Sequence, residues 1–184
     1  ELTNAKPQEL SNLAYQLTGG RQRGRMASGS NTERHRGEAW SLLAVTTGNT
    51  SIVERISMFK QMPKAEAQRI FECRVDTMYF KTKKETDDFS QAIENNYGHA
   101  GKVYIQYLMD HLEDAKKLLA QVQARVDEKA NLTAENRFWS MLVAATITGL
   151  ILAKRAGLID FDTKKTFSWA LEQLTENKRQ VEDM

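Results

Sequence analysis

The spacing of apolar residues divides the chain into two zones, and the first zone begins with a helix. Apolar side chains recur there every three or four residues, at Leu10, Leu13, Ala14 and Leu17. This spacing places them on one face of a helix, which Pro7 can start and Gly19-Gly20 can end. Two shorter helices are predicted from Thr50 to about Phe59 and from Pro63 to near Arg69.

Two short apolar runs in the same zone have the composition of buried strands. The first extends from Trp40 to Thr47, and the second extends from Ile70 to Val75. The first run has no polar alternation, which is typical of a strand covered on both faces, and the second is a further strand candidate. Before the first run, residues 21–38 contain almost no apolar side chains, and their glycines and Ser30-Asn31 predict an exposed loop or hairpin.

From residue 85 onward the pattern is helical. The predicted helices run from Thr86 to about Gly98, from His99 to about Lys129, from Thr133 to Gly157, and onward from a cap at Asp160 or Asp162. The apolar stretch Phe138–Ala153 is shorter than the roughly 20 residues of a membrane span. We therefore expect a buried core helix there, with no membrane as partner.

These elements predict a mainly α protein with a small α/β part. Residues 1–80 would form the α/β domain with its two strands, and residues 81–184 would form a helical domain of packed antiparallel helices. An apolar fraction of 41% is sufficient for a core in a chain of 184 residues. The start of the chain shows no signal-peptide pattern, so a cytoplasmic location is expected.

The distribution of charged residues, cysteine and histidine indicates which ligands the chain can bind. The net charge of +2 does not by itself indicate a nucleic-acid binder, but five arginines and one acid lie between residues 21 and 36. The arginines are Arg21, Arg23, Arg25, Arg34 and Arg36. One cysteine excludes an internal disulfide, and the three histidines lack metal-ligand spacing, so no metal site is expected.

Three further positions stand out by their place in the order of elements. Glu1 begins the segment Glu1-Leu2-Thr3-Asn4, Asn49 follows the first predicted strand, and Arg69 directly precedes the second. Each position also has a plainer interpretation. Glu1 can be a mere chain boundary, Asn49 can form a Gly-Asn turn, and Arg69 can bind the negative end of a helix.

The order of these features resembles the second half of a ring-forming P-loop ATPase. Glu1-Leu2-Thr3-Asn4 is similar to the D-E-[LI]-T-N segment of phage and plasmid replication ATPases. Asn96-Tyr97-Gly98-His99-Ala100-Gly101 is similar to the Y-G-x-A-G helix junction of phage- and plasmid-encoded primase–helicases, of the superfamily III and AAA+ type. Two further segments resemble the C-terminal helices of those proteins, Arg137-Phe138-Trp139 and Gly157–Asp162.

The resemblance implies a role for each position. Glu1 would orient the attacking water, Asn49 would sense the terminal phosphate, and Arg69 would reach the nucleotide of a neighbouring subunit, with Arg55 and Arg74 as weaker candidates. The basic segment would contact single-stranded DNA in the channel of a homo-oligomeric ring. Arg137 or Lys102 would act as a lid residue on the nucleotide.

One motif of these ATPases is not found in the sequence. The phosphate-binding motif G-x-x-x-x-G-K-[ST] does not occur in these residues. ATP and Mg²⁺ are therefore expected in the intact protein, together with a missing N-terminal half, and no cofactor and no activity are expected on this chain alone. The resemblance also implies a phage-infected or prophage-bearing bacterial host. The alternative is a helical module without enzymatic activity that binds nucleic acid or a partner through a basic arm.

Overall fold

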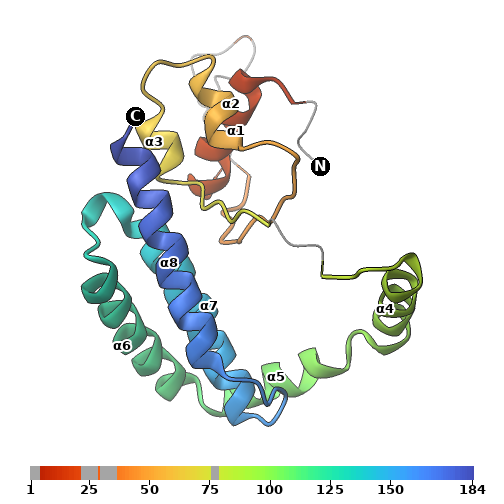
Figure 1. The fold of residues 1–184 in the computed structure, drawn as a ribbon. Coiled ribbons are helices and arrows are strands. Elements are labelled where there is room, and N and C mark those ends of the chain that lie inside the picture. The colour runs from red at the N-terminus through yellow and green to blue at the C-terminus, as the bar shows by residue number, and fades with distance from the viewer. Residues whose placement is uncertain (1–4, 22–28, 30–36, 76–78) are drawn as a thin grey trace. The chain divides into compact units, whose positions relative to one another are not determined.

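The computed structural model describes residues 5–21, 29, 37–75 and 79–184 (Figure 1). All regular secondary structure in these residues is helical, so the prediction of a mainly α protein is confirmed for them. The chain forms two compact units. The first unit comprises Glu1–Glu72 with Lys178–Met184, and the second comprises Cys73–Asn177.

The first unit contains α1 (Pro7–Thr18), α2 (Ile52–Ser57) and α3 (Lys64–Ala67), together with the C-terminal end of α8 (Thr163–Glu182). The predicted first helix is confirmed, with Pro7 in its first turn and Gly19 as its C-cap. Its predicted apolar face packs against the two short helices. The buried apolar side chains of the three helices are Leu10, Ala14, Val53, Ile56 and Ala67.

The start of α2 is held by two groups. Ser51, rather than the predicted Thr50, is the N-cap, and its hydroxyl accepts a hydrogen bond from the Glu54 amide at 3.0 Å. The Glu72 carboxylate accepts hydrogen bonds from the Ser51 hydroxyl and the Ile52 amide, each at 2.6 Å. A negative charge at this end of a helix is favourable because the exposed amides give it a partial positive charge.

Both predicted strands are wrong. Residues 40–47 and 70–75 have no strand pairing, and no strand occurs elsewhere in the described residues. A strand exists only through hydrogen bonds to a neighbouring strand, and neither run has such a neighbour in the described part of the chain. The first run is also uncovered, because Leu42, Leu43 and Val45 are 58%, 64% and 84% exposed.

The second unit begins with two helices, α4 (Lys83–Asn96) and α5 (His99–Asp110). The predicted start of α4 at Thr86 is wrong, because a capping box at Thr82 and Glu85 begins the helix earlier. The predicted long helix from His99 is interrupted at His111, whose backbone leaves the helical region and whose ring stacks on Tyr107 at 4.2 Å.

The remaining helices are α6 (Leu112–Ala130), the short 3₁₀ helix η1 (Ala134–Asn136), α7 (Arg137–Arg155) and α8 (Thr163–Glu182). Helices α6 and α7 make the main packing contact of the unit. Asn131 ends α6 in the left-handed conformation, with φ of 48°, and allows the chain to turn into η1 and α7.

Helix α7 has the burial pattern of the predicted core helix. It buries one face, which includes Trp139, Val143, Ala144 and Ile147, while Met141 on another face is exposed. Gln123 of α6 also donates a hydrogen bond to Ser140 of α7 at 3.2 Å. By length and composition, Ala134–Arg155 is the one helix in the described residues that could cross a membrane, and core helices meet the same conditions.

Candidate functional site

The two ends of the basic segment are held together in the first unit. The Trp40 amide donates a hydrogen bond to the Gly20 carbonyl at 2.8 Å, and the Trp40 indole donates one to the Leu17 carbonyl at 3.0 Å. These bonds fix Trp40 to the C-terminal end of α1. Gly20 and Trp40, which flank residues 21–39 in the sequence, therefore lie side by side.

Gly20 is required at this closure. Its φ is 65°, a left-handed conformation that other residues adopt with strain. A Cβ atom there would also lie 3.1 Å from the Trp40 carbonyl oxygen. Of the five predicted DNA-contacting arginines, Arg21 is described, and its side chain is exposed beside this closure. Arg23, Arg25, Arg34 and Arg36 lie outside the described residues.

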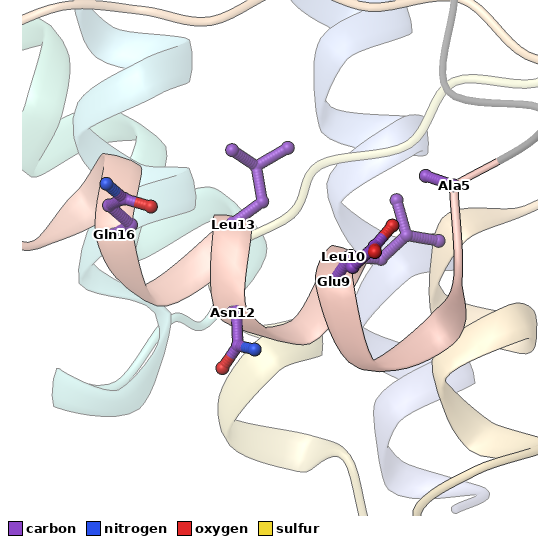
Figure 2. A pocket seen from close by; sticks show the side chains of 6 residues that line it. All are labelled: Ala5, Glu9, Leu10, Asn12, Leu13 and Gln16. Carbon is purple, nitrogen blue, oxygen red and sulfur yellow. The ribbon is translucent and has the colours of Figure 1, made fainter.

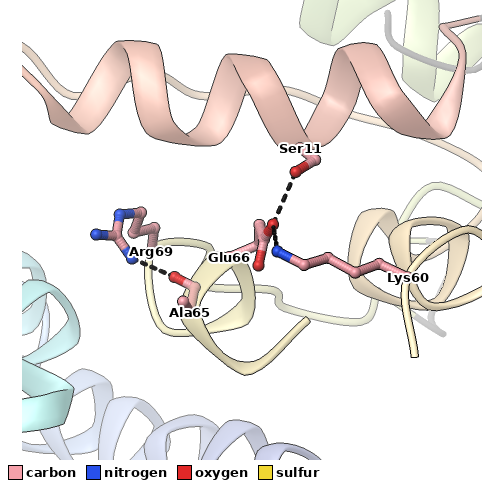
Figure 3. Close-up of polar contacts among 5 residues, drawn as sticks. All are labelled: Ser11, Lys60, Ala65, Glu66 and Arg69. Carbon is pink, nitrogen blue, oxygen red and sulfur yellow. Dashed lines mark hydrogen bonds and ion pairs between the residues drawn. The ribbon is translucent and has the colours of Figure 1, made fainter. Parts of the chain in front are cut away.

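Arg69 follows α3 and contacts its own unit (Figure 3). Its guanidinium donates a hydrogen bond to the Ala65 carbonyl, and its Cζ lies 4.5 Å from the centre of the Tyr15 ring on α1. The plainer interpretation of this arginine, a cation that binds carbonyls at the end of a helix, therefore matches its contacts. The same contacts hold it at a defined place between α1 and α3.

A buried carboxylate fixes the helix that precedes Arg69. Glu66 on α3 is fully buried, and its Oε1 accepts hydrogen bonds from the Ser11 hydroxyl at 2.7 Å and from the Lys60 ammonium at 2.6 Å (Figure 3). Its Oε2 is buried and has no hydrogen-bond partner among the described residues. Ser11 lies on α1, so this carboxylate joins α3 to α1 at the centre of the unit.

The hydrogen-bond partners of Glu66 determine the direction in which its pKa is shifted. Burial alone would raise the pKa of the Glu66 carboxyl, but the hydrogen bonds from Lys60 and Ser11 outweigh it and hold that pKa below 4.5. The hydrogen bond to Glu66 in turn raises the pKa of Lys60 above 10.5. The pair is therefore ionised at neutral pH.

This pairing predicts a pH-dependent stability. Replacing Glu66 with glutamine is expected to lower the free energy of unfolding of the first unit by about 1 to 3 kcal/mol at pH 7. Because the folded-state pKa is depressed, the stabilisation is complete above 4.5 and is lost as the pH falls through the folded-state value. The unfolding free energies of the two proteins should therefore converge once the pH falls below the folded-state pKa of Glu66. Urea denaturation at several pH values measures this, and a difference that stays constant with pH would contradict it.

A matched control is available on the neighbouring helix. Glu54 of α2 is exposed, so Glu54→Gln should change the free energy of unfolding by less than about 0.5 kcal/mol at any of these pH values.

The other predicted site residues lie at exposed positions. Asn49 is exposed and precedes the Ser51 cap of α2, and Glu1 lies outside the described residues. In the second unit, Lys102 lies in the first turns of α5 and Arg137 is the first residue of α7. The Arg137 guanidinium lies 5.0 Å from the centre of the Phe138 ring. Both cations occupy the end of a helix where anions are favoured.

A shallow hollow on α1 contains none of the predicted site residues (Figure 2). Its lining residues are Ala5, Glu9, Leu10, Asn12, Leu13 and Gln16. This set includes one acid and no cation, so it lacks the positive charge that a phosphate ligand requires. Within the described ranges, no three His, Cys, Asp or Glu side chains are grouped to hold a metal ion.

The sequence did not indicate the two features that organise the first unit. Trp40 was assigned to a strand, although it closes the basic segment on α1. Glu66 was not singled out at all, and its contact with Ser11 spans 55 positions of the chain. A carboxylate between two apolar alanines, Ala65 and Ala67, was the available signal for Glu66.

Comparison with known proteins gives no relative. No protein-family model, curated protein or solved structure matches this chain.

Proposed function

We propose that these residues are the C-terminal part of a ring-forming P-loop ATPase, a phage-type replicative helicase that moves on single-stranded DNA. The observation that carries the proposal is the closure of the basic segment at Trp40 and Gly20. Because the residues that flank this five-arginine segment are joined, we infer a hairpin that can enter a channel and contact a strand. Its position in the order of motifs, between Glu1 and Asn49, is the position of such a hairpin in the ATPases that the chain resembles.

The chemistry of the segment fits a phosphate backbone. Arginine carries a permanent charge and several donors, and phosphate contacts hold a strand without reading its bases. Residues 21–36 include no Phe, Tyr or Trp, so base stacking is not implied for this contact. The contact is therefore independent of sequence, as translocation along DNA requires.

Arg69 is the residue proposed to act on the nucleotide of a neighbouring subunit. In the structure its guanidinium contacts Tyr15 and the Ala65 carbonyl. A cation–π contact at an accessible site contributes roughly 0.5 to 1 kcal/mol, and a hydrogen bond to a charged group roughly 1.5 to 3 kcal/mol. A phosphoryl group that develops negative charge can replace both contacts, so Arg69 can exchange partners at modest cost.

The nucleotide site itself is proposed to lie largely on another part of the protein. The described residues provide no cluster of carboxylates for Mg²⁺ and no phosphate-binding loop. These residues do not form a binding site for Mg²⁺. We propose three roles for this chain. Its basic segment contacts DNA, Arg69 reaches the nucleotide of the neighbouring subunit, and Lys102 and Arg137 belong to a helical lid over the nucleotide.

Binding of single-stranded DNA by this chain tests the proposed contact between the basic segment and the DNA backbone. Replacing Arg21, Arg23 and Arg25 with alanine is expected to weaken binding at least tenfold at low salt and to flatten the dependence of log K on log salt. Fluorescence anisotropy with a labelled oligothymidine measures both. The triple change Lys164→Ala, Lys165→Ala and Lys178→Ala is a control of equal charge outside the segment. Binding that survives the arginine changes would remove the segment from DNA contact.

A second candidate is a helical binding module without enzymatic activity. The observation that favours it is the purely helical character of the described residues. It shares the basic arm with the first proposal but has no catalytic partner. ATP hydrolysis by the whole protein distinguishes the two.

A further inference from the structure

Two consecutive helices of the second unit bury none of their side chains. Neither α4 nor α5 contains a buried residue, over 14 and 12 residues respectively. Helices of this length are marginal in water without tertiary packing. Helix α4 is nevertheless amphipathic, and its capping box is complete. A surface of this kind is stabilised by a partner.

The apolar side of α4 is rich in aromatic side chains. Phe89 and Ile93 are one turn apart on the same face and are 50% and 51% exposed. Phe80 packs against Phe89 at 4.9 Å, and Tyr79 contacts Phe80 at 6.4 Å, so the surface continues before the helix. We call Tyr79, Phe80, Phe89 and Ile93 the α4 face. Aromatic residues of this kind are common anchors of protein interfaces.

The first unit presents a second uncovered apolar surface. Met58, Phe59 and Met62, in the turn between α2 and α3, are 84%, 57% and 64% exposed. We call these three residues the methionine turn. Methionine side chains are flexible and adapt to an incoming helix. The turn is thus a suitable acceptor for an amphipathic helix.

The charges of the two surfaces are opposite. Helix α4 carries two lysines against four acids, namely Glu85, Asp87, Asp88 and Glu94. Residues 55–64, which include the methionine turn, carry no acid and three cations, namely Arg55, Lys64 and Lys60, the last of which is paired with the buried Glu66. Opposite charge around two apolar surfaces favours their association and fixes its register.

We propose that the α4 face of one copy of this chain docks on the methionine turn of a second copy. The contact joins two different surfaces, so it is head-to-tail, and repetition of such a contact generates a ring where the rotation between copies closes. The inference rests on the ring assembly proposed above and names the surfaces that form it. In that arrangement each subunit receives the helix of one neighbour beside the α3 segment that leads to Arg69.

The area of the two surfaces determines the expected affinity of self-association. A fully covered aromatic side chain buries roughly 150 to 250 Å², and Phe89 and Ile93 are already half covered, so the face offers on the order of 400 Å². This is below the about 800 Å² per partner of a standard interface. A single contact should therefore be weak, with a Kd on the order of tens of micromolar, and closure of a ring would strengthen it.

Single substitutions on each surface test the contact in the 184-residue chain. Phe89→Asp on the donor and Met58→Asp on the acceptor should each raise the Kd of self-association at least tenfold in sedimentation equilibrium. Gln91→Ala, on the other side of α4, and Gln61→Ala, in the same turn, are exposed controls that leave the charge of each surface unchanged and should associate as the parent does. Equal self-association by Phe89→Asp and the parent would overturn the proposal. Because α4 buries no residue, Phe89→Asp should also leave the unfolding transition unchanged.

Mixing the Phe89→Asp and Met58→Asp variants shows which surface binds the α4 face. The Met58→Asp copy keeps an intact α4 face and the Phe89→Asp copy keeps an intact methionine turn, so a head-to-tail contact predicts heterodimers with the Kd of the parent contact. Pairing of α4 with α4, docking within one chain, or a different partner predicts no heterodimer, and this result would overturn the proposal. The measurement uses neither nucleotide nor DNA, so its failure is separate from a failure of the proposed helicase function.

Discussion

Replacing Arg69 with alanine is expected to lower the rate of ATP hydrolysis by the whole protein about a thousandfold or more, while the affinity for ATP changes little. An arginine supplied by a neighbouring subunit stabilises charge on the transferred phosphoryl group, and its contribution to the rate is typically 10³ to 10⁵. In the proposed ATPase the nucleotide of the ground state would be held mainly by other parts of the protein, so binding should persist. Steady-state hydrolysis and equilibrium binding of a labelled nucleotide measure the two effects separately.

Two neighbouring arginines provide controls for this change. Arg74 is exposed five positions later, and Arg55 on α2 donates a hydrogen bond to the Ala5 carbonyl. Arg74→Ala should leave the rate of hydrolysis within a factor of about two to three, which corresponds to roughly 0.6 kcal/mol. A similar loss in all three variants would indicate general damage, and an unchanged rate in Arg69→Ala would remove this residue from the mechanism.

Replacing Trp139 with alanine is expected to destabilise the second unit by about 3 to 5 kcal/mol. Trp139 is 1% exposed at the start of α7, and it belongs to the largest fully buried side chains of the described residues. Its removal leaves a cavity in the α7 packing that the surrounding helices fill only in part. Guanidinium denaturation followed by circular dichroism measures the loss.

Trp169 on α8 is a control of the same residue type. Its side chain is 47% exposed, so Trp169→Ala should cost much less, about 1 kcal/mol. Equal destabilisation by the two changes would contradict the core described here for α7.

Helices that depend on local signals were predictable from the sequence. The first helix has a proline at its start, a glycine pair at its end and one apolar face, and it was placed within one residue of α1. The start of α4 was misplaced because Thr82 and Thr86 are both possible caps. Only Thr82 has a glutamate three residues later, and this capping box decides the start.

The features that depend on distant partners were not predictable. The apolar run after Trp40 has strand composition, but composition does not supply a neighbouring strand. The contact of Glu66 with Ser11 and the closure of the basic segment by Trp40 join residues far apart in the chain. The break at His111 carries no glycine or proline, so no local signal marked it.

Hydrolysis of ATP by the whole protein that the gene encodes, measured with and without single-stranded DNA, tests the central proposal most directly. The proposal predicts hydrolysis that increases several-fold with single-stranded DNA, and loses this increase when Arg21, Arg23 and Arg25 are replaced with alanine. A whole protein that binds single-stranded DNA through these arginines but neither binds nor hydrolyses ATP would contradict it.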